Sequence, residues 1–155
     1  MNDRPNFAEM SGLDAIRQSM SSGKTLATMG RTLDFELVEA EFGRTVFEGR
    51  PGEGHLNPNR IVHGGYAATL LDSCTGIAIQ TTLPPGRTFT TLELKVNYIR
   101  AMAHDGRPVR AVGQTIHVGR TTATAEGRIV DADDRLLAHA TTTCLLLDIP
   151  AARDK

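Results

Sequence analysis

Residues 57–72 read NPNRIVHGGYAATLLD, in which a polar loop runs into His63-Gly64-Gly65 and then into an apolar helix pattern. Backbone N–H groups in the first turn of a helix have no intrahelical partner, so they can polarise a carbonyl group. The helix pattern carries one carboxylate, Asp72, and an acid among apolar residues is a candidate base or nucleophile. Together, the free N–H groups and the acid indicate acyl chemistry.

The helix pattern extends from about residue 63 to residue 82, and its residues are apolar or small on nearly every side. Such a pattern predicts a helix that is buried nearly all round. Pro84-Pro85-Gly86 follows directly and ends the helix.

Strand patterns surround this helix. Period-two alternation predicts strands at 33–41, 45–50, 90–99, 107–118, 121–130 and 136–147, after a short amphipathic helix at about 7–20. Within the strand at 90–99, Leu92, Leu94, Val96 and Tyr98 are expected on one face. One buried helix among six strands predicts an α+β fold in which an antiparallel sheet wraps the helix. We expect a single domain over residues 1–155, with its core at about 33–147.

The composition excludes several classes of function. The formal net charge is −1, which leaves no overall basic field to attract nucleic acid. No apolar run approaches the roughly 20 residues of a membrane span, and the polar N-terminus has no apolar signal core. Cys74 and Cys144 lie in apolar segments, so we expect reduced core cysteines in a cytoplasmic protein, with a disulfide or a reactive thiol as the alternative. No cysteine or histidine spacing typical of a metal site occurs.

Three segments together resemble a known family. They are the loop and helix from Asn57 through His63-Gly64-Gly65 to Asp72, the strand at 91–100, and the segment at 117–121, which reads HVGRT. In this order they resemble the acyl-CoA thioesterases of the PaaI type, over about residues 33–147. The resemblance implies the hotdog fold, in which a curled antiparallel sheet wraps a long central helix. It also implies hydrolysis of an aryl- or medium-chain acyl-CoA.

The resemblance implies a role for each matching residue. Asp72 would attack the thioester carbon or activate a water to attack it, and the Gly64 N–H would hold the thioester oxygen. Asn57 would place the carbonyl or the water, with an Asx turn as its alternative role. Thr91 would position the water. Thr90 would take this role if the spacing between Asp72 and the hydroxyl differs from that of the family by one residue. An ordinary strand position is the alternative for Thr91.

Three further residues match the family's pattern and also have an ordinary structural explanation. His63 is expected to bond backbone or loop atoms at the helix start, with a catalytic role as the alternative. Gly65, together with Gly64, allows a tight entry into the helix and can also bind substrate. Arg120 lies at a turn and is either a solvated cation or a contact to a coenzyme A phosphate.

Thioester hydrolysis suits this small set of groups. Because the pKa of a thiol is about 8.5, the thiolate leaves readily and needs little protonation. One carboxylate and a few N–H donors are therefore sufficient, so we expect neither a metal nor a cofactor, with coenzyme A as part of the substrate. Asp72 can act as a base toward water or attack directly to form an anhydride, and the sequence leaves both routes open.

The spacing of Gly64 and Asp72 predicts a shared site. They are eight residues apart, which is about 12 Å along a helix that rises about 1.5 Å per residue. Reacting atoms must lie within roughly 3–3.5 Å of each other. One carbonyl cannot contact both residues, so the second half should come from another subunit across a twofold axis. We therefore expect a homodimer, and the resemblance adds a dimer of dimers (a tetramer).

Two other functions are alternatives. A hydratase or dehydratase of the same fold would pair a histidine with an acid in motifs that this sequence lacks. A non-catalytic acyl-CoA sensor of this fold would carry a DNA-binding domain. The roughly 30 residues before the first predicted strand are neither basic nor a helix-turn-helix pattern.

Overall fold

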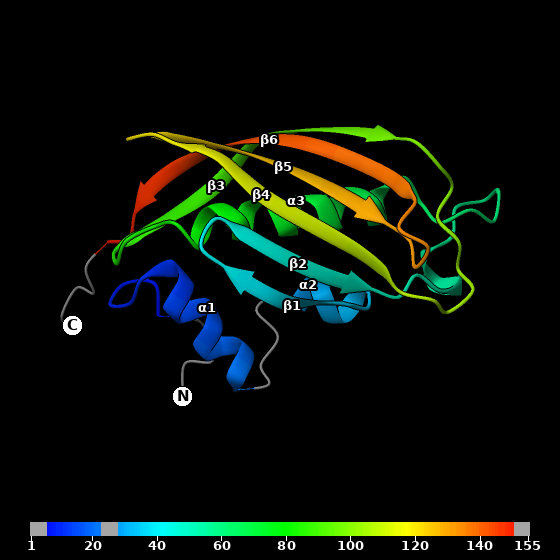
Figure 1. Cartoon of the computed structure of the whole chain (residues 1–155), viewed down its shortest axis with the longest axis horizontal. Coiled ribbons are helices and arrows are strands. Elements are labelled where there is room, and N and C mark those ends of the chain that lie inside the picture. Colours follow the sequence, from blue (N-terminus) through cyan, green and yellow to red (C-terminus); the bar gives the residue numbers. More distant parts are fainter. Residues whose placement is uncertain (1–5, 23–27, 151–155) are drawn as a thin grey trace.

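The computed structural model describes residues 6–22 and 28–150, so the expected polar N-terminus and charged C-terminal tail lie largely outside the described residues. The helices are α1 (Gly12–Ser21), α2 (Thr28–Thr32) and α3 (Gly64–Gln80), with a 3-10 turn, η1, at Glu53–His55. The strands are β1 (Phe35–Glu41), β2 (Arg44–Gly49), β3 (Arg87–Tyr98), β4 (Val109–Val118), β5 (Thr122–Val130) and β6 (Leu136–Asp148). This order confirms the expected elements, and it adds α2, which the sequence pattern did not predict (Figure 1).

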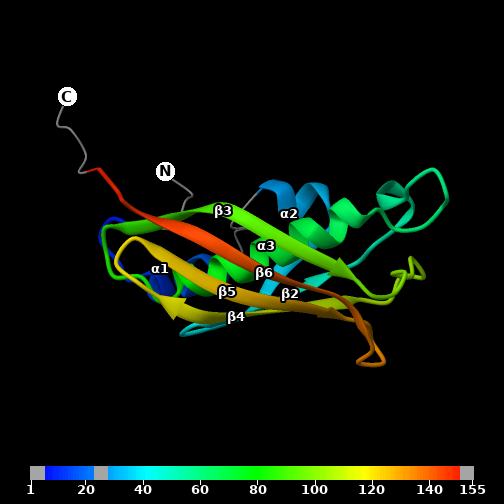
Figure 2. The same ribbon diagram turned by 90° about the horizontal axis from the view of Figure 1, so that it is seen from above.

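The six strands form one antiparallel sheet in the order β1-β2-β4-β5-β6-β3. The long helix α3 runs along one face of this sheet, and the strands cross over it (Figures 1 and 2). Strands β1 and β3 form the two edges, although they lie on either side of α3 in the chain. The arrangement confirms the α+β hotdog architecture that the resemblance implies.

The N-terminal helix starts later than the apolar pattern predicts. It begins at Gly12 rather than at Phe7, because the Ser11 side chain caps it by accepting a backbone N–H of the first turn. The Gly12 N–H donates to the carbonyl of Leu83, just beyond the end of α3. A Cβ at Gly12 would collide with the Gln80 carbonyl oxygen, so the glycine lets α1 dock against the end of α3.

Two glycines let α3 lie directly on the sheet. Gly113 on β4 pairs with Gly127 on β5. A Cβ at Gly113 would collide with the Cys74 carbonyl oxygen, and a Cβ at Gly127 would lie 2.8 Å from the Thr75 methyl carbon. Thr45 on β2 donates a hydrogen bond to the same Cys74 carbonyl at 2.7 Å. These contacts fix the position of the helix that carries the candidate acid.

The side of α3 that faces away from the sheet is only partly covered, so the expectation of burial nearly all round is wrong for the single chain. Ten of its 17 residues are buried, among them Leu71 and Cys74 on the sheet side. Gly65, Thr69 and Asp72 lie on the other side, where they are exposed or half-buried. Small residues line this side of α3, so the sequence pattern does not distinguish it from the buried side.

Strand β3 departs from regular alternation at Leu92. Its pairing with β6 skips Leu92 directly after Thr91, which makes Leu92 a β-bulge. Leu94 and Val96 pack against the core, whereas Leu92 is 58% exposed, so the expected common face is wrong at Leu92. Because a bulge shifts the alternation by one residue, Thr91 rather than Thr90 faces α3.

Within the described ranges, no helix is long and apolar enough to span a membrane. Cys74 and Cys144 are free and buried, which confirms the expected core cysteines. Burial raises the pKa of both thiols, so each stays protonated near neutral pH. The cytoplasmic location stays a prediction.

Candidate active site

Asp72 and Thr91 meet between α3 and β3. The Thr91 hydroxyl donates a hydrogen bond to Oδ1 of Asp72 at 2.9 Å. Asp72 is half-buried, so its carboxylate keeps an open side that a water or a substrate can reach. Thr90 is exposed, and its side chain points to the other face of β3. Of the two candidate threonines, the structure therefore brings Thr91 to the acid.

A buried cysteine lies behind this pair. Cys144 on β6 is opposite Thr91 in the strand register, and its Sγ is 4.0 Å from Thr91 Oγ1. A threonine hydroxyl has one proton, which Thr91 gives to Asp72, so its oxygen can still accept from the thiol or from a water. The hydroxyl is thus held with its donor directed at the acid.

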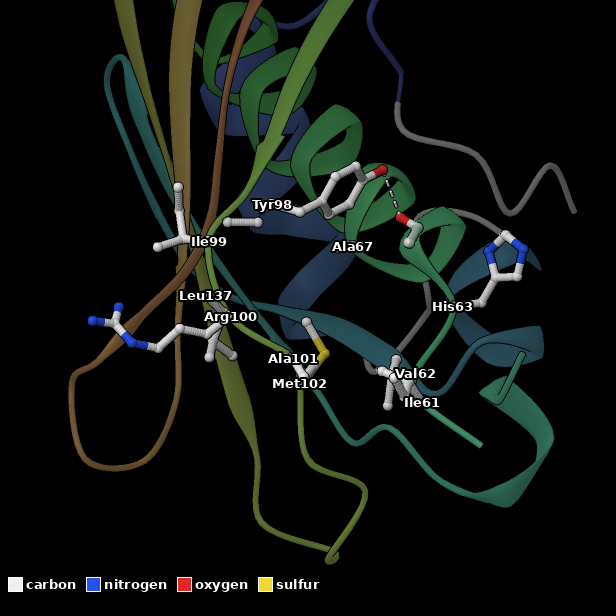
Figure 3. Close-up of a pocket in the computed structure, with 12 residues that line it drawn as sticks. Ile61, Val62, His63, Ala67, Tyr98, Ile99, Arg100, Ala101, Met102 and Leu137 are labelled. Carbon is white, nitrogen blue, oxygen red and sulfur yellow. Dashed lines mark hydrogen bonds between the residues drawn. The ribbon is translucent and has the colours of Figure 1, made fainter. Parts of the chain in front are cut away.

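The start of α3 presents one free backbone donor. His63 caps the helix, because its Nδ1 accepts the Gly65 N–H at 2.8 Å. The Gly64 N–H has no acceptor within the part of the chain that the structure describes. A carbonyl oxygen placed against it would gain a hydrogen bond and the positive end of the helix dipole. The His63 ring is exposed and points away from Tyr98 and Met102 (Figure 3).

Asn57 forms an Asx turn in the loop before α3. Its side-chain oxygen accepts the N–H groups of Asn59 at 3.0 Å and of Ile61 at 3.1 Å. A backbone bond from the His63 N–H to the His55 carbonyl, 2.8 Å long, closes the same loop. The side-chain NH₂ group of Asn57 bonds to no acceptor among residues 6–22 and 28–150, so it is available as a second donor.

An apolar pocket opens beside the start of α3. It has a volume of about 310 Å³, and Gly64 and Tyr98 form part of its wall. His63 also lines it, and the apolar lining residues are Ile61, Val62, Ala67, Ile99, Ala101, Met102, Leu137 and Ala138. Arg100 lines the pocket as well, and its guanidinium extends away from Tyr98 and donates to the Leu136 carbonyl at 2.7 Å (Figure 3). Size and lining suit an uncharged, largely apolar group.

Tyr98 is a residue of this region that the sequence did not reveal. Its hydroxyl donates to the Gly64 carbonyl at 3.1 Å, and a Cβ at Gly64 would lie 3.1 Å from the tyrosine Cζ. Period-two alternation places Tyr98 on the inner face of β3, but it gives no sign that the ring passes over the start of α3. The two residues are 34 positions apart, so no local pattern reports the contact.

Arg120 lies apart from these groups, in the exposed turn between β4 and β5. Its carbonyl accepts a hydrogen bond from Arg87 Nη2 at 3.1 Å, which ties the turn to the start of β3. Its guanidinium has no partner among the described residues, so it is free to contact a phosphate.

The site consists of two halves that share one helix. Asp72 with Thr91 forms the first half, and the Gly64 N–H at the start of α3 forms the second. Across the described ranges, no group of three or more histidine, cysteine, aspartate or glutamate side chains is placed to hold a metal ion.

Sequence comparisons relate the chain to known proteins. A family model described as Thioesterase superfamily matches residues 59–138, which is more than half of the chain. A protein of Halobacterium salinarum is 36% identical over 93 residues, which are 59% of this chain and 56% of that protein. The 1,4-dihydroxy-2-naphthoyl-CoA hydrolase of Listeria monocytogenes is 26% identical over 112 residues, which cover 72% of this chain and 89% of the hydrolase.

Solved structures show the same relationship. A mutant of the phenylacetic acid degradation protein PaaI from Thermus thermophilus matches with a TM-score of 0.70 and 25% identity, covering 77% of this chain and 98% of that one. A hypothetical thioesterase from Streptococcus pneumoniae, solved with coenzyme A, matches with a TM-score of 0.68 and 26% identity, covering 76% of this chain and 88% of that one. The chain therefore belongs to the thioesterase superfamily and has the hotdog fold.

Proposed function

We propose that this protein is an enzyme that hydrolyses acyl-CoA thioesters to a free acid and coenzyme A. The observation that carries the proposal is the hydrogen bond between Asp72 on α3 and Thr91 on β3, together with the free N–H of Gly64, the first residue of α3. Membership of the thioesterase superfamily supports the reaction type. The names of the Listeria hydrolase and of the pneumococcal thioesterase solved with coenzyme A support the substrate class.

Asp72 acts either as a base or as a nucleophile. As a base it takes a proton from a water held against the Thr91 oxygen, and that water attacks the thioester carbon. As a nucleophile it attacks the carbon itself and forms an anhydride, which water then opens at the Asp72 carbon. Solvent oxygen-18 in a single turnover separates the routes, because direct attack puts the label first into Asp72 and not into the product acid.

Backbone and amide donors hold the thioester oxygen. The Gly64 N–H binds this oxygen as negative charge develops, and a well-placed donor of this kind contributes about 3–4 kcal/mol. The free NH₂ group of Asn57 serves as a second donor or holds the water. His63 supports the site by capping the helix, and Gly65 contributes the open space that its missing side chain leaves.

A second subunit completes each site. Gly64 and Asp72 are about 12 Å apart on one helix, too far to act on the same carbonyl. The partly covered side of α3, with Gly65 and Thr69, leaves room for a second helix beside Asp72. Strand β3 lies next to this side as a sheet edge with Leu92 exposed, and unpaired edges favour association. A twofold axis here gives a homodimer with two shared sites, and the dimer of dimers stays a prediction.

The acyl group is an aryl or a medium-chain group. The apolar pocket of about 310 Å³ supports this choice, since Gly64 lines it and the group attached to the thioester carbonyl can extend into it. Arg120, with its free guanidinium, contacts a coenzyme A phosphate.

A panel of aryl- and alkyl-CoA esters, assayed by release of the coenzyme A thiol, tests the proposed function. We expect turnover of phenylacetyl-CoA, benzoyl-CoA or octanoyl-CoA, and little turnover of acetyl-CoA, which fills the pocket least. Hydration of crotonyl-CoA without hydrolysis of any ester would instead support the hydratase. Binding of the esters without any reaction would support the sensor.

Replacing Thr91 with valine tests the acid–hydroxyl pair. Valine keeps the shape of threonine but removes the donor to Asp72 and the acceptor for water. A hydrogen bond to a charged group is worth about 1.5–3 kcal/mol, so we expect kcat to fall by about 10- to 100-fold. Thr90→Val is the matched control, because Thr90 is exposed and faces away from α3. A larger loss in Thr90→Val than in Thr91→Val would contradict the assignment.

A further inference from the structure

Side chains hold both ends of the peptide between Gly64 and Gly65. The Gly64 carbonyl accepts the Tyr98 hydroxyl at 3.1 Å, drawn as the dashed line in Figure 3, and the Gly65 N–H donates to His63 Nδ1 at 2.8 Å. Two successive glycines give the least restricted backbone that a helix start can have. The two side-chain bonds therefore limit how this peptide can turn.

The Gly64 N–H belongs to the preceding peptide, between His63 and Gly64, and the backbone dihedral angles of Gly64 couple the orientations of these two peptides. The carbonyl of that preceding peptide, which belongs to His63, accepts the Tyr66 N–H at 2.9 Å. With hydrogen bonds on both neighbouring peptides, the Gly64 N–H is held in one direction. A hydrogen bond weakens steeply when its donor and acceptor are misaligned. The loss of one of these anchoring hydrogen bonds would therefore weaken the hydrogen bond from the Gly64 N–H to a thioester oxygen.

Tyr98 is the anchor that comes from outside the helix. It stands at the end of β3, and its ring packs over Gly64, where a Cβ would meet the ring atoms at 3.1–3.2 Å. It lines the same pocket as Gly64 and is 57% exposed. An exposed hydroxyl that bonds to a backbone carbonyl contributes little to stability, because water can replace the partner. A contribution to stability therefore does not by itself explain the hydrogen bond from Tyr98 to the Gly64 carbonyl.

We propose that Tyr98 is a positioning residue for hydrolysis. Its hydroxyl holds the Gly64 carbonyl so that the Gly64 N–H points at the thioester oxygen, and it thereby connects the end of β3 to the oxygen-binding half of the site. The inference rests on the proposed function, because the direction of this N–H matters only when a thioester carbonyl lies against it.

Tyr98→Phe tests the hydroxyl while it keeps the ring over Gly64. We expect kcat to fall by about fivefold to tenfold with KM nearly unchanged, because the misdirected donor weakens binding of the transition state more than that of the substrate. The melting temperature should stay within about 2 °C of the wild type. Tyr66→Phe is the matched control: it also removes a tyrosine hydroxyl near the start of α3, but that hydroxyl lies 3.5 Å from the Asp34 carbonyl and away from Gly64. We expect Tyr66→Phe to keep the wild-type kcat.

A vibrational measurement reports on the Gly64 N–H itself. In an Asp72→Asn background, phenylacetyl-CoA and octanoyl-CoA labelled with carbon-13 at the thioester carbonyl can be bound without being consumed. A donor at the carbonyl oxygen lowers its stretching frequency, so isotope-edited infrared spectra should show a downshift on binding. We expect Tyr98→Phe to lose a clear part of that downshift and Tyr66→Phe to retain it.

The outcomes separate this inference from the proposed function. If the wild type hydrolyses the esters while Tyr98→Phe has the same kcat and the same carbonyl band, the inference is overturned and the function stands. A Tyr98→Phe variant that loses activity together with stability, at an unchanged carbonyl band, would show a structural role only and would also overturn it. A rise in KM at constant kcat would assign Tyr98 to ground-state binding instead. If the wild type hydrolyses no ester of the panel, both proposals fall.

Discussion

Replacing Asp72 with asparagine is expected to lower kcat by about 10³-fold, in line with the roughly 10²–10⁴-fold that a positioned base contributes. Asparagine keeps the size of the side chain but can neither take a proton from water nor attack a thioester. Its side-chain oxygen can still accept the Thr91 hydroxyl, so the contact between α3 and β3 persists and the melting temperature should change little. Thiol release from the best ester of the panel measures the loss.

Asp133→Asn is the matched control for this change. Asp133 is an exposed carboxylate that forms ion pairs with Arg107 and Arg135 at 3.3 Å and 3.1 Å, and exposed pairs of this kind contribute little. We expect it to keep the wild-type kcat. Near-normal turnover in Asp72→Asn would remove the acid from the mechanism, whatever the control shows.

The architecture was predictable because local signals agreed with one another. The central helix follows from apolar and small residues that run, with Asp72 and Gln80 as exceptions, to the stop at Pro84-Pro85-Gly86, and the structure ends α3 at Gln80. The strands follow from period-two alternation, and their observed bounds differ from the predicted ones by at most a few residues. Asp72, Gly64 and Asn57 could be singled out because each lies at a marked place in this pattern: an acid within the helix, the helix start and the loop before it.

What the sequence could not predict depends on partners far away in the chain. The bulge at Leu92 arises in the pairing of β3 with β6, and this bulge decides that Thr91 rather than Thr90 reaches Asp72. An alternating run of residues looks the same with or without a bulge. The Tyr98 contact with Gly64 likewise joins the end of one strand to the start of a helix, which no local period reports.

Gly64→Pro removes the N–H that we propose binds the thioester oxygen, and it should leave the helix start in place. Proline is favoured at the first position of a helix, where its missing N–H costs no intrahelical bond. His63, with φ −60° and ψ 135°, already has the extended conformation that a residue before proline prefers. We expect kcat to fall by about 10²-fold or more, as for other lost oxyanion donors. Gly64→Ala is the matched control, because it brings a Cβ equally close to Tyr98 but keeps the N–H.

Subunits that carry different lesions show whether the two halves of a site come from different chains. If Asp72→Asn and Gly64→Pro subunits are co-expressed with different affinity tags, the purified heterodimer has one site with both lesions and one with neither. We therefore expect about half of the wild-type activity from two variants that are inactive on their own. A heterodimer as inactive as its parents, or a fully active monomer, would contradict the shared site.

A second heterodimer, in which one subunit carries both substitutions, is the control for the first and is expected to give the opposite result. A wild-type subunit paired with a subunit that carries both Gly64→Pro and Asp72→Asn has one lesion in each shared site, so this heterodimer should be nearly inactive. If each site were built within one chain, the same heterodimer would retain the activity of its wild-type subunit. Both heterodimers contain the same four residues in the same amounts and differ only in which chain carries them. Activity in the first and its loss in the second can therefore arise only if Gly64 of one subunit acts together with Asp72 of the other.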